Sequence, residues 1–146
     1  MRVLVQRSLK SSVSVNNEIV GSIDKGLVLL VGFTQSDDSS KIDYLINKVL
    51  NLRIFDDEDG VMNKSILDVG GSILSISQFT LYADTKKGNR PSYVNALGGD
   101  KAILLYDEFN NKLKEHVHVE TGIFGADMKV SIINDGPVTI LLESRE

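Results

Sequence analysis

The sequence contains no cysteine among its 146 residues, and this absence removes several kinds of chemistry. Without a thiol the chain cannot form disulfide bonds, use a thiolate nucleophile or bind zinc through cysteine. A cysteine-free chain fits a reducing cytosol, and we expect the protein to be cytoplasmic. A domain of this length buries roughly 70% of the surface of its unfolded chain, so it needs no disulfide or metal to fold.

Long hydrophobic runs are also missing. The longest apolar run, residues 27–33, is far shorter than the stretch of about 20 residues that spans a bilayer. The first residues, which begin Met1-Arg2, lack the apolar segment of a signal peptide. We therefore expect a soluble protein with no membrane contact.

Positive charge is scarce, because 16 Lys and Arg residues face 20 Asp and Glu residues and give a net charge of −4. Phosphate contacts supply much of the affinity for nucleic acids, so an acidic chain needs a local basic patch to bind RNA. One such cluster contains Lys86, Lys87 and Arg90. It is either a solvated loop or a set of phosphate contacts.

The chain has only two histidines, His116 and His118. Alternation over residues 116–119 predicts both on one exposed strand face. A serine-type triad needs a histidine beside the nucleophile, and a zinc site needs further ligands that are not evident here. Phosphate-loop and Gly-x-Ser-x-Gly motifs are absent as well, so we expect no metal and no cofactor.

Apolar patterning predicts a chain rich in strands, with two long helices. Strands are expected at residues 3–9, 13–15, 18–23, 27–31, 73–79, 117–119, 128–133 and 138–142. The run 27–31 is apolar throughout, which predicts a strand covered on both faces. No linker divides the chain, so we expect a single domain, residues 1–146, of the α+β class. Its expected architecture is a mainly antiparallel sheet or open β-barrel flanked by two helices.

The first helix is expected at residues 36–52, capped by Ser36 or Asp37. Its apolar stripe consists of Ile42, Leu45, Ile46, Val49 and Leu50. The second helix is expected at residues 101–115. Its apolar face is predicted to contain Ile103, Leu104, Leu105, Phe109 and Leu113. Between the helices, residues 56–60 lack the ligand spacing of an EF-hand and predict a solvated acidic turn.

Two short segments carry groups suited to chemistry. Ser77-Gln78-Phe79-Thr80 ends an apolar strand and offers hydroxyl, amide and aromatic groups. Spacing alone favours the plainer reading, a strand end with alternating polar residues, because such strand ends are common. Gly136-Pro137 lies between two apolar segments, where a plain turn explains it, although an X-Pro bond there can be cis.

Several segments in the same order resemble the D-aminoacyl-tRNA deacylase family, of the bacterial and eukaryotic type that includes D-tyrosyl-tRNA deacylase. The likeness covers almost the whole chain. It is carried by residues 6–7, 51–55, 77–81, 90–92, 121–128 and 134–139.

The resemblance implies a homodimer that hydrolyses the ester between a D-amino acid and the 3′-terminal adenosine of tRNA, with the active site at the subunit interface. It implies that Ser77, Gln78, Phe79 and Thr80 form the catalytic pocket. It also implies a cis Gly136-Pro137 bond that reaches the partner's site. The residues implied to bind substrate are Gly136, Pro137, Arg7, Met128 and Ala126, and the candidate tRNA phosphate contacts are Lys86, Lys87 and Arg90.

This Gly-cisPro element would act as a proofreading wall that rejects L-amino acids by clash. Glycine has no side chain to clash, so glycyl-tRNA should also be hydrolysed. For the chemical step, Thr80 could attack the ester. Alternatively, backbone N–H groups at Phe79 and Thr80 could polarise the carbonyl while the substrate's 2′-hydroxyl orients water. The second scheme is favoured because the sequence offers no general base.

Overall fold

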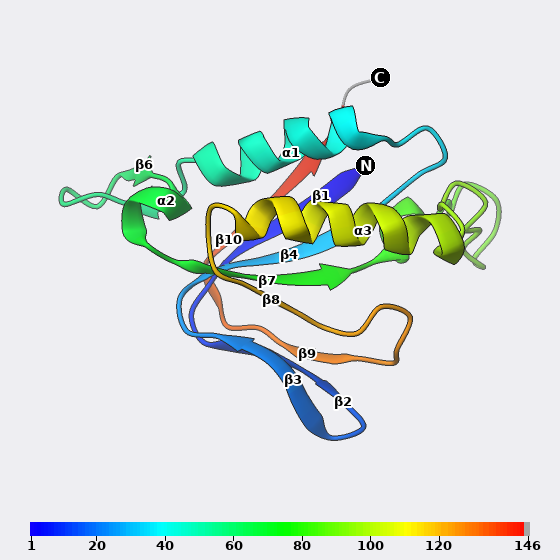
Figure 1. The fold of residues 1–146 in the computed structure, drawn as a ribbon, viewed down its shortest axis with the longest axis horizontal. Helices are drawn as coiled ribbons and strands as arrows, with labels where there is room; N and C mark the ends of the chain where they lie inside the picture. The colour runs from blue at the N-terminus through cyan, green and yellow to red at the C-terminus, as the bar shows by residue number, and fades with distance from the viewer. Residues whose placement is uncertain (145–146) are drawn as a thin grey trace.

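A five-stranded mixed sheet forms the centre of the fold in the computed structural model, which describes residues 1–144 (Figure 1). Its strand order is β10-β1-β4-β7-β8. The bounds are β1 (Arg2–Ser8), β4 (Gly26–Gly32), β7 (Ser72–Ser77), β8 (Val119–Thr121) and β10 (Asn134–Glu143). Strand β1 pairs antiparallel with β10 and β4, whereas β4 pairs parallel with β7, and β7 with β8.

The remaining elements cover the two faces of this sheet. The helices are α1 (Ser39–Asn51), the short α2 (Ile66–Val69), α3 (Gly99–Lys114) and the 3₁₀ helix η1 (Phe79–Tyr82). The other strands are β2 (Ser11–Val15), β3 (Glu18–Ile23), β5 (Phe55–Asp56), β6 (Met62–Lys64) and β9 (Lys129–Ser131). Helices α1 and α3 lie over one face, and the small sheet β3-β2-β9 lies on the other side (Figure 1).

Strand β4 joins the two halves of the core. Its residues Leu27, Leu29 and Val31 pack under the helices, whereas Val28 packs toward β2 and β3. All four side chains are at most 1% exposed. The prediction of a strand covered on both faces is therefore confirmed at residues 27–31.

Helix α1 buries the predicted stripe of Ile42, Leu45, Ile46, Val49 and Leu50. The predicted N-cap was wrong. The helix is capped by Asp38, whose carboxylate accepts hydrogen bonds from the backbone N–H groups of Ser40 and Lys41. Asp37 is not free to cap, because its carboxylate accepts from the Met1 amino group at 2.8 Å and from the Thr34 N–H at 2.7 Å.

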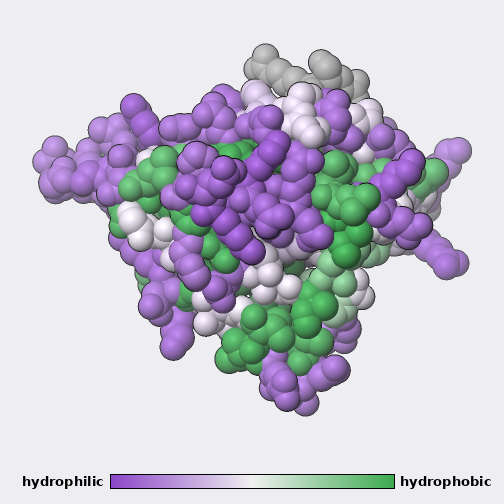
Figure 2. Space-filling model, in the orientation of Figure 1, coloured by the Kyte–Doolittle hydropathy of each residue, from purple (hydrophilic) through white to green (hydrophobic). Residues whose placement is uncertain are grey.

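Helix α3 packs with a different face from the predicted one. Its buried residues are Ala102, Tyr106, Phe109, Asn110 and Leu113. Ile103 is 37% exposed and Leu104 is 67% exposed, and Figure 2 shows apolar surface beside largely polar surface in the region of α3. The Tyr106 hydroxyl donates to the Ser75 carbonyl oxygen at 2.7 Å, which helps to turn the other face toward the sheet.

The α+β class is confirmed, with three corrections. The central sheet is mixed rather than mainly antiparallel, because β4 connects to β7 through α1 and the two strands run parallel. Three α-helices are present in residues 1–144 rather than two, since α2 was missed, and no barrel closes there. Strand β8 begins at Val119, so the histidines precede the strand instead of lying on it.

Helix α2 begins with a capping box, in which Ser65 and Asp68 form reciprocal hydrogen bonds between side chain and backbone. The acidic segment 57–60 is a turn between β5 and β6, as predicted. Within residues 1–144, no helix is both long and apolar enough to cross a membrane.

Candidate active site

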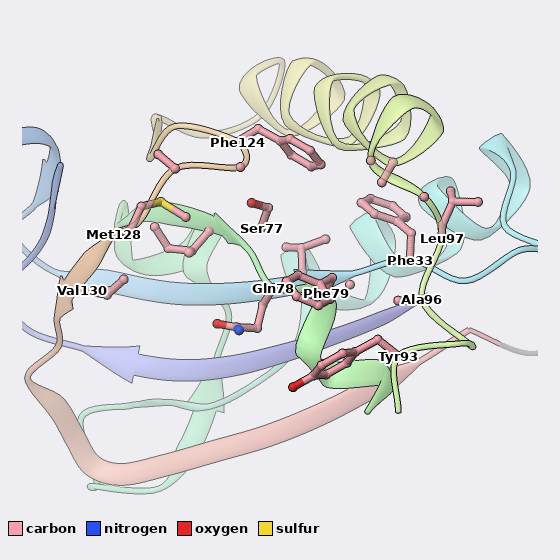
Figure 3. A pocket seen from close by; sticks show the side chains of 18 residues that line it. Phe33, Ser77, Gln78, Phe79, Tyr93, Ala96, Leu97, Phe124, Met128 and Val130 are labelled. Carbon is pink, nitrogen blue, oxygen red and sulfur yellow. The ribbon is translucent and has the colours of Figure 1, made fainter. Parts of the chain in front are cut away.

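A pocket of about 590 Å³ opens at the carboxyl ends of the parallel strands β4 and β7 (Figure 3). Four segments line it: residues 31–33 after β4, residues 76–79 after β7, residues 93–102 leading into α3, and residues 124–130 between β8 and β9. Its walls are largely apolar, with aromatic rings from Phe33, Phe79, Tyr93 and Phe124. The pocket therefore suits a ligand with a flat, apolar part.

The end of β7 brings the predicted catalytic segment to this pocket. Ser77, Gln78 and Phe79 all line it. The backbone N–H of Gln78 donates to the Val31 carbonyl oxygen at 2.7 Å, which continues the pairing with β4 for one more residue. Ser77 and Gln78 then point in different directions from the strand end (Figure 3).

The strand ends two residues earlier than predicted, because the chain turns at Gln78 into η1. Phe79 is consequently 57% exposed, and its ring packs edge-on against Tyr93 with centroids 5.0 Å apart. Arg2 supports η1 from below by donating to the Leu81 carbonyl oxygen at 2.7 Å. Burial raises the pKa of the adjacent Tyr82, whose ring lies under the Arg2 guanidinium.

The first turn of η1 leaves backbone donors available. A helix cannot pair its first N–H groups internally, and Gln78 provides no side-chain cap. Among residues 1–144, no acceptor is hydrogen-bonded to the N–H of Phe79 or of Thr80. Adjacent unpaired N–H groups of this kind can bind a carbonyl oxygen and stabilise negative charge on it.

Thr80 differs from its three neighbours because it does not line the pocket. Its hydroxyl oxygen accepts a short hydrogen bond from the Gln78 side-chain amide. An amide nitrogen donates protons and cannot remove one, so this contact does not activate Thr80. The histidines follow the far end of α3, which is 16 residues and about 24 Å long, whereas the start of α3 lines the pocket.

Ala126 and Met128 also line the pocket, and Figure 3 shows Met128 on the side away from Tyr93 and Leu97. Met128 packs against a glycine, since a Cβ at Gly122 would lie 2.5 Å from the Met128 sulfur. The predicted site did not include the wall residues Phe33, Tyr93, Leu97 and Phe124. Phe124 lies inside the segment 121–128 that carried the resemblance, so its position was the one available signal.

The basic residues Lys86, Lys87 and Arg90 are exposed on a loop next to the pocket. Reciprocal backbone hydrogen bonds of 2.8 and 2.9 Å between Asp84 and Ser92 close this loop. The chain then continues directly into Tyr93 of the pocket wall. The cluster is thus held beside the mouth rather than inside the pocket.

Gly136 and Pro137 lie elsewhere, near the start of β10, and the bond between them is cis. Arg7 holds this bend. Its Nε donates to the Asp135 carbonyl oxygen at 3.2 Å and lies 3.3 Å from the Asp135 carboxylate, and its Nη1 donates to the Ile54 carbonyl oxygen at 2.8 Å. Both Gly136 and Pro137 are exposed.

Within one subunit, the Gly136-Pro137 bend lies far from the pocket. On strand β4, Leu27 pairs with Arg7 of β1 and Val31 pairs with Ser77 of β7. Arg7 and Ser77 are therefore offset by four residues of β4, or about 13 Å along the strands. Strands β1 and β4 also separate β10 from β7, which adds about 14 Å across the sheet. Neither Arg7, Gly136 nor Pro137 lines the pocket.

Comparison with known proteins places this geometry in a family. Residues 4–143 match the family described as D-Tyr-tRNA(Tyr) deacylase. A solved structure named c-Myc DNA Unwinding Element Binding Protein is 39% identical, with a TM-score of 0.95 and 100% of both chains covered. The structure of a probable eukaryotic D-amino acid tRNA deacylase is 18% identical, with a TM-score of 0.82 and 97% of both chains covered, and it shows a shared fold.

The family match covers nearly the whole chain and includes the pocket, the basic loop and the Gly136-Pro137 bend. The chain belongs to the D-Tyr-tRNA(Tyr) deacylase family, and it is a hydrolase that deacylates D-aminoacyl-tRNA.

Proposed function

We propose that this protein is a cytoplasmic, single-domain proofreading enzyme that clears D-amino acids, and also glycine, from the 3′-terminal adenosine of tRNA. The observation that carries the proposal is the pair of unpaired N–H groups at Phe79 and Thr80, placed at the edge of an aromatic pocket. The N–H pair binds the ester carbonyl. The aromatic walls receive the base of the terminal adenosine, because bases stack well on such side chains.

The proposed active form is a homodimer in which each pocket is completed by the partner subunit. The support is the separation within one chain of two elements that the family resemblance places in one site. The Gly136-Pro137 bend is exposed, so a second copy can insert it without unfolding. Arg7 then acts as a positioning residue, because it fixes the bend through Asp135.

Discrimination between D- and L-amino acids follows from the substrate groups that the bend would contact. Gly136 and Pro137 would direct backbone carbonyl oxygens at the substrate's amino group and Cα. A D-residue then points its side chain outward, whereas an L-residue drives its side chain into the bend. Such a site selects by clash rather than by extra attraction, and glycine escapes the clash.

The assay that tests this function measures release of amino acid from D-tyrosyl-, L-tyrosyl- and glycyl-tRNA in parallel. We expect the D-tyrosyl ester and the glycyl ester to be cleaved, and the L-tyrosyl ester to be cleaved at least about 100-fold more slowly. Equal cleavage of the two tyrosyl esters would instead identify a general ester hydrolase. No cleavage of any ester would contradict an enzymatic role.

A nucleic-acid-binding role without turnover is the second candidate. It is favoured by the 39% identical structure, whose name describes binding to a DNA unwinding element. The net charge of −4 opposes broad nucleic-acid binding and restricts contacts to the basic loop. Binding of tRNA or DNA without release of amino acid would support this candidate over the deacylase.

The basic loop leads to a salt-dependence prediction. If Lys86, Lys87 and Arg90 contact three phosphates near the single-stranded 3′ end, raising salt from 50 to 200 mM should increase KM by about 20-fold. Replacing all three residues by glutamine should raise KM and flatten this dependence. Lys114→Gln, at the far end of α3, serves as the control. An unchanged salt dependence in the triple variant would show that the loop does not contact phosphate.

A further inference from the structure

The outer wall of the pocket, residues 93–97, is held by side chains that follow β4. The Gln35 side-chain amide donates to two wall carbonyl oxygens, of Val94 at 3.0 Å and of Ala96 at 3.1 Å. The Thr34 hydroxyl donates to the carbonyl oxygen between them, that of Asn95, at 2.5 Å. Three successive carbonyl groups of the wall are therefore bonded to two neighbouring residues.

The other contacts of the wall lie mainly at its two ends, where the Val94 N–H donates to the Ser92 hydroxyl oxygen at 3.4 Å and Leu97 packs against the core. Residues 93–97 belong to no helix or strand, and the described internal bond runs from the Ala96 N–H to the Tyr93 carbonyl oxygen at 3.0 Å. One backbone bond, from the Leu97 N–H to the Phe33 carbonyl oxygen, anchors its end at 3.0 Å. The placement of the wall thus depends strongly on Thr34 and Gln35.

The wall faces the pocket with three side chains. Tyr93, Ala96 and Leu97 line the cavity, and Tyr93 also packs against Phe79. The groups suited to the ester belong to a different segment, at the end of β7, where Figure 3 shows Ser77 and Gln78, and the wall meets Phe79 through its ring rather than its backbone. A displaced wall would therefore disturb binding of the nucleotide more than the reacting bond.

We propose that Thr34 and Gln35 are positioning residues that clamp the wall over the terminal nucleoside of the substrate. The inference rests on the proposed function, because it takes adenosine as the group against the wall. The clamp requires donors, since all three of its partners are carbonyl oxygens. A glutamate at position 35 keeps the shape but has no amide donor, and a valine at position 34 keeps the shape but has no hydroxyl.

The test compares Gln35→Glu and Thr34→Val with the wild-type enzyme on D-tyrosyl-tRNA. Loss of one such hydrogen bond weakens binding by about fivefold, so we expect KM to rise about fivefold in Thr34→Val and tenfold or more in Gln35→Glu. The value of kcat should change by less than about twofold, as for lost uniform binding. Thr34→Ser retains the hydroxyl and should restore the wild-type KM.

Ser36→Ala is the matched control, because Ser36 is exposed, adjacent, and makes no side-chain hydrogen bond within residues 1–144. A second readout is the dissociation constant of adenosine 5′-monophosphate, which should increase in parallel with KM. A wild-type KM and nucleotide affinity in Gln35→Glu would overturn the clamp. A lowered Tm with unchanged KM would also overturn it, because that result describes a purely structural role.

The outcomes also separate the clamp from the proposed function. If the wild-type enzyme does not cleave D-tyrosyl-tRNA, the proposed function fails. Nucleotide affinity then still decides the clamp: weaker binding of adenosine 5′-monophosphate in Gln35→Glu supports it, and equal binding overturns it. If the wild type cleaves the ester and both variants keep its KM, only the clamp is contradicted.

Discussion

Replacing Gly136 with alanine is expected to lower the rate of D-tyrosyl-tRNA deacylation by about 100-fold, because small displacements of positioned groups have effects of this size. A Cβ at this position would lie 2.8 Å from Val138 Cγ2, 2.9 Å from the Val138 nitrogen and 3.2 Å from Arg7 Nη2. The φ angle of Gly136 is +120°, which L side chains rarely adopt. The bend, or the Arg7 side chain that holds it, must therefore move.

The matched control for this variant is Gly60→Ala. Gly60 also has a positive φ angle, of +75°, but a Cβ there would meet nothing within 4 Å. It lies in the acidic turn between β5 and β6, so it carries backbone strain without a clash at the bend. We expect a modest loss of stability and a wild-type rate. If both variants lose activity equally, or if Gly136→Ala stays folded and fully active, the bend does not belong to the site.

Mixing subunits tests whether the bend acts across the dimer. Gly136→Ala would damage the partner's site, whereas Phe79→Ala damages the pocket of its own chain. In a mixed dimer these two defects fall in the same site, and the other site is intact. Random reassembly should therefore restore about a quarter of the wild-type sites. No recovery above the parent variants would place the bend and the pocket in the same chain.

Local patterns in the sequence predicted much of the fold. The 3.6-residue spacing in α1 identified its five buried residues, and the continuous run 27–31 identified the strand covered on both faces. In α3 the same method failed at residues 102–106, where five consecutive apolar or aromatic residues hide the period. Packing against β7 through Tyr106 decided which face is buried, and that contact joins residues 31 positions apart.

Long-range contacts also explain the wrong cap and the missing wall. Asp37 is a good capping residue by type, but its carboxylate binds the Met1 amino group 36 residues away. The wall 93–97 has no regular pattern, and its position comes from Thr34 and Gln35, about 60 residues earlier in the chain. A sequence pattern reports neighbours along the chain, so neither contact could be inferred from it.

The site shows the same division. The resemblance, rather than the strand-end pattern, predicted Ser77, Gln78 and Phe79 as site residues and linked them to the bend at residues 136–137, and all three line the pocket. The sheet register then added what neither pattern nor resemblance supplied. It places the bend at the opposite end of the sheet from the pocket, which makes a second subunit a requirement of the proposed site.

A tRNA that ends in 2′-deoxyadenosine is expected to react with a kcat at least about 100-fold lower, after correction for its slower spontaneous hydrolysis. This is the usual size of a lost acid–base contribution. The reason is that, within residues 1–144, no histidine or carboxylate lines the pocket. The Thr80 hydroxyl is paired with the amide of Gln78, and the two histidines lie at the far end of α3. The substrate's own 2′-hydroxyl remains as the group that can orient water.

The same reasoning expects Thr80→Ala to lose less than about tenfold in kcat, because the variant keeps the backbone N–H that binds the ester oxygen. A substrate with a 2′-deoxy group at the penultimate nucleotide is the control, since it removes a hydroxyl away from the reacting bond. Abolished turnover in a folded Thr80→Ala enzyme, with the terminal 2′-deoxy substrate still cleaved, would identify Thr80 as the nucleophile. A covalent ester on Thr80 should then be detectable by mass spectrometry. If instead the 2′-hydroxyl is essential and Thr80 is not, the protein contributes mainly geometry: two N–H groups, an aromatic pocket and the partner's bend.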